Sequence, residues 1–243
     1  MSARTLSALI LALGTASAAH ATTITQWTFN STTPDGSTGT GSTAAAIGSG
    51  SLTLLGGVTN PGFNSGAGSS DTAASDNSGL QTSNYALQGA GDKTTGLQFS
   101  ASSVGYQDVV FSFDLRFSNT SSKYALVQYS LDGLTYIDAN VFTASGGDTW
   151  MNQLTVDLSN VAGADNNANL SFRVLSTFAP GTTSYVPASA TKIYGTNGTW
   201  RFDTVTVSGS AMTAAVPEPS SYALAFAGLA VVGTVARRRR QVR

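Results

Sequence analysis

Residues 109–117 read Val-Val-Phe-Ser-Phe-Asp-Leu-Arg-Phe. Large apolar side chains occupy every second position from Val109 to Phe117, and the positions between them hold a valine, a serine, an aspartate and an arginine. Successive side chains of a strand point to opposite faces, so a period of two predicts a β-strand with one face in a core.

Further stretches with strand character lie on both sides of this one. Asp132-Gly133 marks a tight turn between residues 123–130 and a partner strand that contains Tyr136 and Ile137. The remaining segments with a period of two or strong β-propensity are residues 24–29, 51–55, 154–158, 170–174 and 200–207. We expect about nine or ten strands and no helix in this part, that is, an all-β fold of two antiparallel sheets stacked as a jelly-roll-like β-sandwich, with the first and last strands paired.

The N-terminus has the three parts of a secretory signal peptide. Arg4 provides a positive charge, residues 6–13 form a short apolar core, and Ala19 and Ala21 form a small-x-small cleavage site. This apolar core is too short to span a bilayer. We therefore expect residues 1–21 to be a signal helix that signal peptidase removes. The alternative is an N-terminal helix buried in the fold.

A longer apolar segment lies near the C-terminus. A polar lead-in with Pro217, Glu218 and Pro219 precedes residues 222–236, which are almost all apolar or small and carry no charge. That length is near the lower limit for a single transmembrane helix. The basic tail that follows at once consists of Arg237, Arg238, Arg239, Arg240 and Arg243. Arginines beside such a span stay on the cytoplasmic side, so the body of the protein is expected outside the membrane.

The order of Pro-Glu-Pro, apolar helix and arginine cluster over residues 216–243 resembles the PEP-CTERM sorting signal of Gram-negative bacteria. The same kind of segment is also catalogued as the C-terminal domain of certain ice-binding proteins. The resemblance implies recognition by an exosortase, a membrane transpeptidase that cuts near the Pro-Glu-Pro and releases or transfers the body to the surface. It also implies a species that makes exopolysaccharide. A plain tail anchor is the alternative.

The body between these ends, residues 22–215, is acidic. It contains six Lys and Arg against twelve Asp, which gives a net charge of −6. Such a body is a poor match for nucleic acid, so no nucleic-acid partner is expected. The body has no Cys and no His, since the one histidine is His20. This excludes a disulfide framework, a Ser-His-Asp triad and an ordinary zinc site. Residues 32–78 are low in complexity and predict long loops with one strand.

Part of the body resembles a module of exported PEP-CTERM proteins and some secreted hydrolases. The stretches that carry this resemblance are residues 104–120, with Val-Gly-Tyr-Gln-Asp at their start, residues 127–133, Val-Gln-Tyr-Ser-Leu-Asp-Gly, and residues 157–159 and 166–173. In those proteins the module looks like a non-catalytic β-sandwich similar to carbohydrate-binding modules. The resemblance implies the fold more strongly than it implies any ligand.

Asp203 breaks the pattern of its segment. Strict alternation puts its carboxylate on the same face as Val205 and Val207, where a charge is costly unless it is paired or bound to a metal. Carbohydrate-binding sandwiches often hold a structural Ca²⁺ where their first and last strands meet, so the resemblance implies Asp203 and Asn30 as candidate ligands. The alternatives are a hydrogen bond to the backbone or to Arg201, and a β-bulge that turns Asp203 outward.

Together these features predict a protein that is not an enzyme and that acts as a structural or binding component of the extracellular polysaccharide layer. It would be exported, anchored transiently in the inner membrane and then sorted to the cell surface. Two other functions stay open. An ice- or surface-adhesion protein would be favoured by regular Thr-x-Thr ladders. A carbohydrate-active enzyme would need two Asp, since the body has no Glu, and would be favoured by two buried Asp close together in a cleft with raised pKa values.

Overall fold

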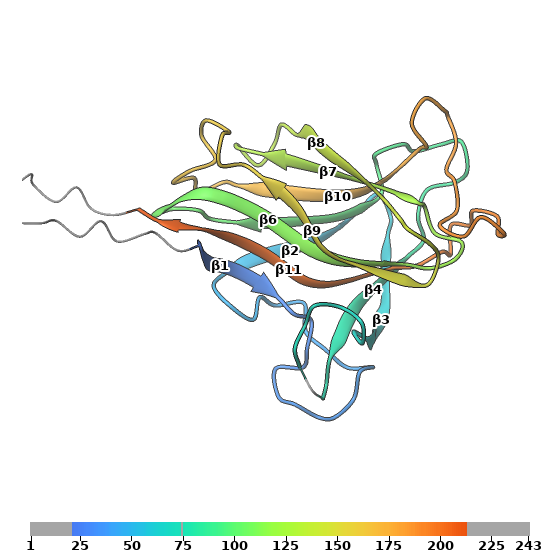
Figure 1. Cartoon of the computed structure of the whole chain (residues 1–243), viewed down its shortest axis with the longest axis horizontal. Helices are drawn as coiled ribbons and strands as arrows, with labels where there is room; N and C mark the ends of the chain where they lie inside the picture. Colours follow the sequence, from blue (N-terminus) through green and yellow to red (C-terminus); the bar gives the residue numbers. More distant parts are fainter. Residues whose placement is uncertain (1–20, 74, 213–243) are drawn as a thin grey trace, which may run out of the picture. The chain divides into compact units, whose positions relative to one another are not determined.

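The structure is a computed structural model that describes residues 21–73 and 75–212 (Figure 1). Within these ranges the regular structure consists of eleven β-strands. The strands are β1 Ala21–Trp27, β2 Gly50–Leu55, β3 Thr59–Ser65, β4 Ser78–Ser83, β5 Gly96–Ala101, β6 Tyr106–Phe117, β7 Tyr124–Ser130, β8 Ile137–Thr143, β9 Thr149–Asp157, β10 Ser171–Thr177 and β11 Trp200–Ala211.

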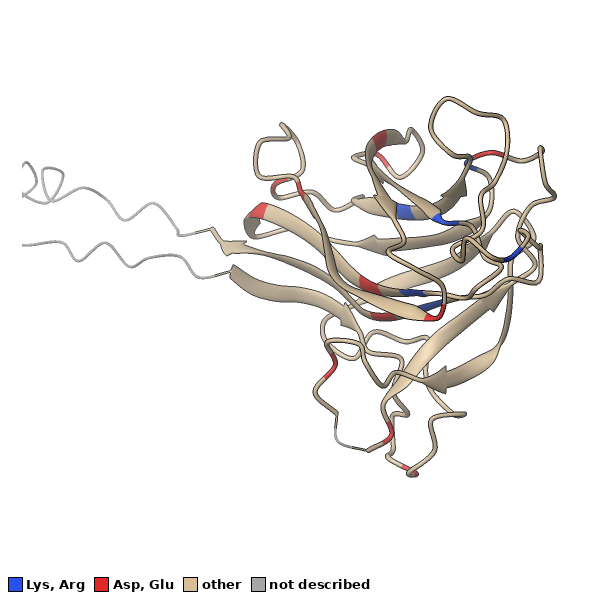
Figure 2. Cartoon of the chain, turned by 45° about the vertical axis from the view of Figure 1, so that its right-hand side comes forward, with Lys and Arg blue, Asp and Glu red and all other residues tan. Residues whose placement is uncertain are grey.

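The strands form two antiparallel sheets, which confirms the predicted β-sandwich. Sheet A has the order β3-β4-β11-β6-β9, with β1 also paired to β11, and sheet B has the order β2-β5-β10-β7-β8. The predicted pairing of the first and last strands is therefore present, and from β4 onward the strands follow the order of a jelly roll. Charged residues are few and are scattered over the strands and the loops (Figure 2).

Residues 32–78 contain more β-structure than their composition predicts. The expected strand near residues 51–55 is β2, but β3 follows it at once and brings the described total to eleven strands instead of nine or ten. Pro61 and Gly62 remove the strand signal from β3. Both residues are tolerated there because β3 is an edge strand of sheet A and its pairing with β4 is irregular between Thr59 and Gly62.

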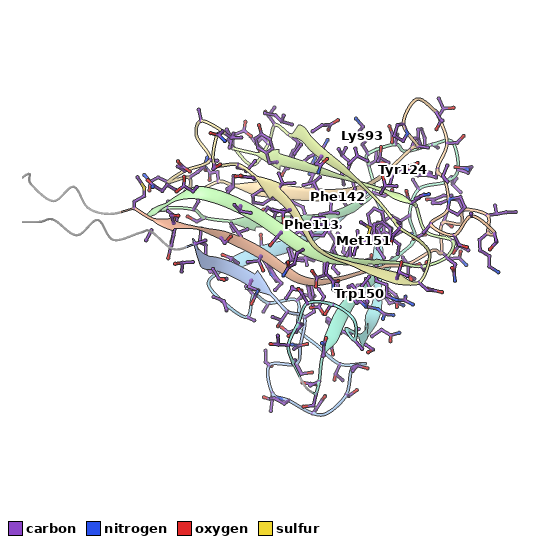
Figure 3. The ribbon with its side chains drawn as sticks, in the orientation of Figure 1. Lys93, Phe113, Tyr124, Phe142, Trp150 and Met151 are labelled. Atoms are coloured by element: carbon purple, nitrogen blue, oxygen red, sulfur yellow. The ribbon has the colours of Figure 1, made fainter. Side chains whose placement is uncertain are left out.

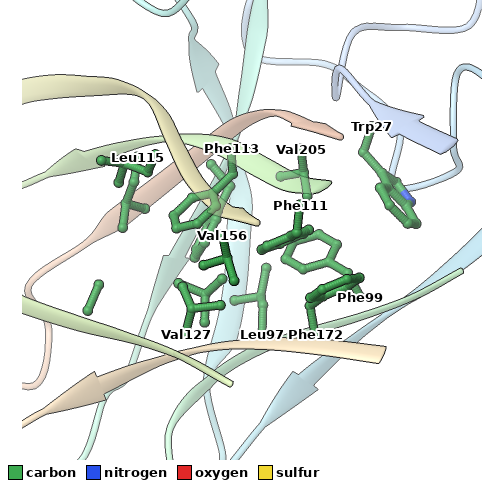
Figure 4. Close-up of a cluster of buried hydrophobic side chains, with 14 of the residues drawn as sticks. Trp27, Leu97, Phe99, Phe111, Phe113, Leu115, Val127, Val156, Phe172 and Val205 are labelled. Carbon is green, nitrogen blue, oxygen red and sulfur yellow. The ribbon is translucent and has the colours of Figure 1, made fainter. Parts of the chain in front are cut away.

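The apolar face of β6 makes the centre of the core, as its sequence predicts. Its five core positions, from Val109 to Phe117, are all fully buried. The ring of Phe111 is stacked on that of Phe172 from the opposite sheet, with centroids 4.3 Å apart and an angle of 5° between the planes. Phe113 meets Phe142 of β8 edge to face at 5.8 Å (Figure 3). These contacts join sheet A to sheet B through aromatic packing (Figure 4).

Among the described residues, the buried hydrophobic core is built from side chains between Trp27 and Val207. Ala21, one of the two predicted cleavage-site alanines, is the first described residue and pairs with Ser210. The rest of the predicted signal peptide, including Ala19, lies outside the described residues. In the ranges that the structure describes, no helix has the length and apolarity needed to cross a membrane.

Truncation of Phe111 to alanine should lower the free energy of unfolding by about 3–5 kcal/mol, because it leaves a cavity between the two sheets at the stacked ring pair. Leu134→Ala is the control, since Leu134 is 85% exposed and its loss should change stability by no more than about 0.5 kcal/mol. Urea unfolding of the two purified variants measures both values. Equal effects would contradict the assignment of Phe111 to the core.

Candidate functional site

Asp203 lies on the outer face of sheet A, so the prediction that it shares the core face of Val205 and Val207 is wrong. The register of β11 against β6 shifts between Asp203 and Thr206, and Thr204 has a φ of 44°. This β-bulge inserts one extra residue, which reverses the facing of the side chains beyond it. Asp203 consequently stands opposite Asp114 of β6. The bulge was one of the alternatives that the sequence left open.

Asp203 is nevertheless fully buried, because the loop between β3 and β4 covers it. Its Oδ2 accepts a hydrogen bond from the Ser69 hydroxyl at 2.7 Å, and its Oδ1 accepts one from the Thr204 amide at 2.7 Å. At Gly66 a methyl carbon would lie only 2.6 Å from Asp203 Oδ2, so only glycine allows the loop to approach this closely. The carboxylate is thus satisfied by the covering loop and by its own bulge.

The covering loop is attached to sheet A at several points. The Trp150 indole donates to the Ala67 carbonyl at 2.9 Å, and the Asn152 amide donates to the Gly68 carbonyl at 2.9 Å. From β11, the Arg201 guanidinium donates to the Ser65 carbonyl at 2.7 Å. These bonds come from strands on both sides of β6, so the loop lies across the strand that carries Asp114.

Asp114 is the second buried carboxylate of this region, with 1% of its surface exposed. Its Oδ1 accepts a hydrogen bond from the backbone N–H of Gln153 at 2.7 Å. Its Oδ2 accepts one from the Thr204 hydroxyl at 2.8 Å and another from the backbone N–H of Ser70. Gln153, like Thr204, has a positive φ, and the pairing of β6 with β9 shifts register beside it. Irregular backbone in both neighbours of β6 thus supplies donors to one buried acid.

A carbohydrate-active enzyme would be favoured by two buried Asp that lie close together in a cleft with raised pKa values. Asp114 and Asp203 meet part of this condition, since both are buried and they stand opposite each other. Burial, together with the nearby Asp71 and Asp114 carboxylates, raises the pKa of Asp203 to about 8, although the Ser69 hydroxyl and the Thr204 amide oppose the shift. A polar cleft of about 350 Å³ lies beside them and is lined by Asp114, Gln153 and Thr204, among others, but not by Asp203. A substrate in that cleft would meet Asp114, whose oxygens already have donors, and would not reach Asp203.

Asn30 is connected to Asp203 only indirectly. Its side-chain amide donates to Asp71 Oδ2 at 2.7 Å, and its side-chain oxygen accepts the Ser78 amide at 2.8 Å. Asn77, which the sequence does not distinguish, has a buried Oδ1 without a hydrogen-bond partner. This oxygen and Asp203 Oδ2 both lie against the Cα of Gly66, where a Cβ would clash with them. The described residues contain no group of three or more Asp, Glu, His or Cys arranged for a metal. A Ca²⁺ at Asp203 and Asn30 therefore stays a prediction.

The outer face of sheet B carries a second group of polar residues, which sequence reasoning missed. Five side chains from all five strands align in one row across the sheet through the strand pairing. In strand order they are Thr53, Gln98, Arg173, Gln128 and Asp138. Each belongs to a different strand, and only the pairing of residues far apart in sequence brings them together.

The row is ordered by contacts among its own members and two neighbours. Arg173 Nε donates to Gln98 Oε1 at 3.0 Å, and Gln128 Nε2 donates to Asp138 Oδ1 at 2.7 Å. The Arg173 guanidinium lies 3.4 Å from the centre of the Tyr136 ring, and Lys93 forms an ion pair with Asp138 at 2.6 Å. The Tyr136 ring is therefore partly covered by a cation.

A parallel row of serines runs beside it. The pairing aligns Ser51, Ser100, Ser171 and Ser130, and the hydroxyls of Ser100 and Ser171 are 2.6 Å apart. A shallow hollow of about 430 Å³ lies over this row and includes Gln98 from the first. Farther along the same face, Leu126 and Leu175 are buried. The open part of the face is thus mainly polar, with charges at Arg173, Lys93, Asp138 and Asp132 and an exposed Val141 beside Leu126.

Residues 215–240 match the family described as the PEP-CTERM protein-sorting motif. The chain therefore carries this motif at its C-terminus, and Pro217, Glu218, Pro219 and the predicted transmembrane segment lie within the match. So do the arginines of the tail, Arg237, Arg238, Arg239 and Arg240. All of these residues lie outside the part of the chain that the structure describes. No curated protein matches the chain.

Comparison of the chain with solved structures gives matches of low sequence identity. The CBM22-1–CBM22-2 tandem domain of Paenibacillus barcinonensis Xyn10C is 16% identical with a TM-score of 0.44, over 85% of this chain and 49% of that one. The CBM22-1–GH10 modules of Clostridium thermocellum Xyn10B are 15% identical with a TM-score of 0.38, over 69% and 27%. The K1 cleaved adhesin domain of Lys-gingipain from Porphyromonas gingivalis W83 is 14% identical with a TM-score of 0.36, over 66% and 98%. The match spans about half of the Xyn10C chain and about a quarter of the Xyn10B chain.

Replacement of Asp203 by asparagine should reduce the dependence of stability on pH. The pKa of Asp203 is about 8 in the folded protein and near 3.9 in an unfolded chain, so the folded state binds more protons between these values. The contribution of Asp203 to the free energy of unfolding therefore falls as pH rises from about 4 to about 8. Urea unfolding at several pH values, in a chelating buffer, should show a smaller fall for Asp203→Asn than for the parent or for Asp165→Asn. The same slope in all three would contradict this pKa.

Proposed function

We propose that this chain is an exported protein that exosortase sorts to the cell surface, where its β-sandwich binds an extracellular polysaccharide. The PEP-CTERM motif at residues 215–240 supports the sorting. Signal peptidase would act first: it would recognise Ala19 and Ala21 and cut after Ala21. The C-terminal helix would then hold the protein in the inner membrane until exosortase cuts near Pro217. The body would then be a binding or structural component of the polysaccharide layer.

The aligned polar row on sheet B is the observation that carries the binding proposal. Sugar hydroxyls both donate and accept hydrogen bonds, and the amides of Gln98 and Gln128 and the neighbouring serines offer both kinds of partner. The row is already ordered by internal hydrogen bonds, which reduces the entropy lost on binding. A body with a net charge of −6 disfavours nucleic acid and acidic polymers, so a neutral polysaccharide fits best.

Processing should remove both ends of the exported protein. We expect the surface form to begin at Thr22 and to lack the residues beyond about Pro219, because the cleavage site and the sorting motif lie there. Intact-mass measurement of protein released from the cell surface tests this. Surface protein that still contains Arg243 would contradict sorting by exosortase.

Substitution of Arg173 by alanine should weaken polysaccharide binding by about tenfold or more. The substitution removes a charged donor from the centre of the row, and a hydrogen bond to a charged group contributes about 1.5–3 kcal/mol. Arg116→Ala on the outer face of sheet A is the matched control, because Arg116 is also partly buried and pairs with Asp148 at 3.0 Å. A glycan array identifies the ligand, and titration calorimetry measures the affinities.

The outcome of this comparison separates the possibilities clearly. Loss of binding in Arg173→Ala alone supports the face of sheet B as the site. An equal loss in both variants would contradict that location. A failure of the parent protein to bind any neutral glycan would contradict the binding function itself, while leaving the processing prediction to its own test.

A further inference from the structure

A second polar row lies on the outer face of sheet A. Strand pairing aligns one residue from each of four strands, β1, β11, β6 and β9 (Figure 1). In this order they are Gln26, Thr206, Ser112 and Thr155. Each of the four stands between two buried residues of its own strand, so alternation turns its side chain away from the core. Three hydroxyls and one side-chain amide therefore point outward in line.

The polar cleft of about 350 Å³ beside Asp114 is the space over this row, since all four residues line it. Ser70, from the loop between β3 and β4, lines it as well, and its hydroxyl lies 3.3 Å from the Thr204 hydroxyl. The row thus forms the floor of the cleft, and the loop that covers Asp203 forms one wall.

The backbone beside the cleft is strained on both sides of β6. Thr204 and Gln153 line the cleft, and their φ angles are 44° and 55°. Residues other than glycine rarely adopt this left-handed conformation, and a β-branched residue such as threonine is a clear outlier there. Such strain persists only where the surrounding structure enforces it, and it gathers at sites that hold ligands. The two residues therefore mark the cleft as more than a gap in the surface.

The floor of the cleft is ordered, yet it keeps hydrogen-bonding capacity for a ligand. The Gln26 side-chain amide donates to the Thr206 hydroxyl at 2.9 Å, and the Thr155 hydroxyl donates to the Gln153 carbonyl at 2.8 Å. These bonds reduce the entropy that the row would lose on binding. Between them, the Ser112 hydroxyl has no hydrogen-bond partner among the described residues. It can donate to a ligand and also accept from one.

The lining of the cleft favours a neutral ligand rich in hydroxyls. Seven of its ten residues carry a hydroxyl or a side-chain amide, and two are apolar, which is too few to anchor an apolar peptide or lipid. Asp114 is the charged residue of the lining, and neither Lys nor Arg belongs to it. An acidic polymer would thus be repelled, whereas sugar hydroxyls find both donors and acceptors.

We propose that this cleft is a second polysaccharide-binding site, so that one body holds two neutral glycan chains at once. The inference rests on the proposed function and extends it from binding to cross-linking. Stacked sheets lie about 10 Å apart, and the two sites are on the outer faces of the two sheets, so the core separates the bound chains. Such a protein joins neighbouring chains, as a structural component of a polysaccharide layer must.

Titration calorimetry with a short oligosaccharide counts the sites. The probe is cut from whichever of dextran, mixed-linkage β-glucan and galactomannan the parent protein binds. The parent should bind two oligosaccharides per protein. Ser112→Leu, which fills the floor of the cleft, and Arg173→Ala on sheet B should each bind one. Thr59→Leu is the control, since Thr59 is exposed on the edge strand β3 of sheet A and does not line the cleft.

Light scattering with the intact polysaccharide tests the cross-linking itself. The parent and Thr59→Leu should raise the scattering severalfold because they join chains, and excess oligosaccharide should reverse the rise. Ser112→Leu and Arg173→Ala should bind the polysaccharide without this rise, since each keeps one site.

The Ser112 variants also have to be shown to fold. Ser112→Leu should keep the circular dichroism and melting temperature of the parent, because the lost hydroxyl leaves no group unpaired. Ser112→Ala, which removes the hydroxyl alone, should weaken binding at the cleft by roughly threefold to tenfold.

Two results would overturn the proposal, and they differ in what they leave standing. A parent that binds one oligosaccharide, lost in Arg173→Ala and kept in Ser112→Leu, would remove the second site and leave the proposed function intact. A parent that binds none of the three polysaccharides would remove both.

Discussion

The stacking of Phe111 on Phe172 joins the two sheets at the centre of the core, and the rest of the molecule depends on it. Because each sheet directs its large apolar side chains toward the other, the outer faces are left to polar residues. The two outer faces differ in how far loops cover them. A loop covers that of sheet A at Asp203, whereas part of that of sheet B stays open and polar.

The covered face shows how buried acids can stabilise a loop. Asp114 and Asp203 are adjacent on paired strands, and the irregular backbone beside each supplies some of its hydrogen bonds. The remaining donors, Ser69 and Ser70, belong to the loop itself. Loss of the loop would therefore leave two carboxylates short of donors, so the loop and the acids keep each other in place.

The open face of sheet B differs in chemistry from the covered part of sheet A. Its row offers side-chain amides and the Arg173 guanidinium, which hydrogen bonds already hold in position. On sheet A, by contrast, the loop between β3 and β4 covers the Asp203 side chain. The face of sheet B therefore leaves ordered polar groups open to a partner.

The sequence by itself determined the sandwich, the C-terminal sorting motif and the core face of β6, because alternation and short motifs are local properties. It could also identify Asp203 as unusual, but not its facing, because one bulged residue reverses the alternation and leaves no signal in the chain. Tertiary structure alone decided the row from Thr53 to Asp138, since strand pairing joins Thr53 to Gln98 and Gln98 to Arg173, which lie far apart in the chain. It likewise decided the burial of Asp203 under the loop between β3 and β4, because that loop has no periodic pattern and its hydrogen bonds to sheet A form only in the folded chain.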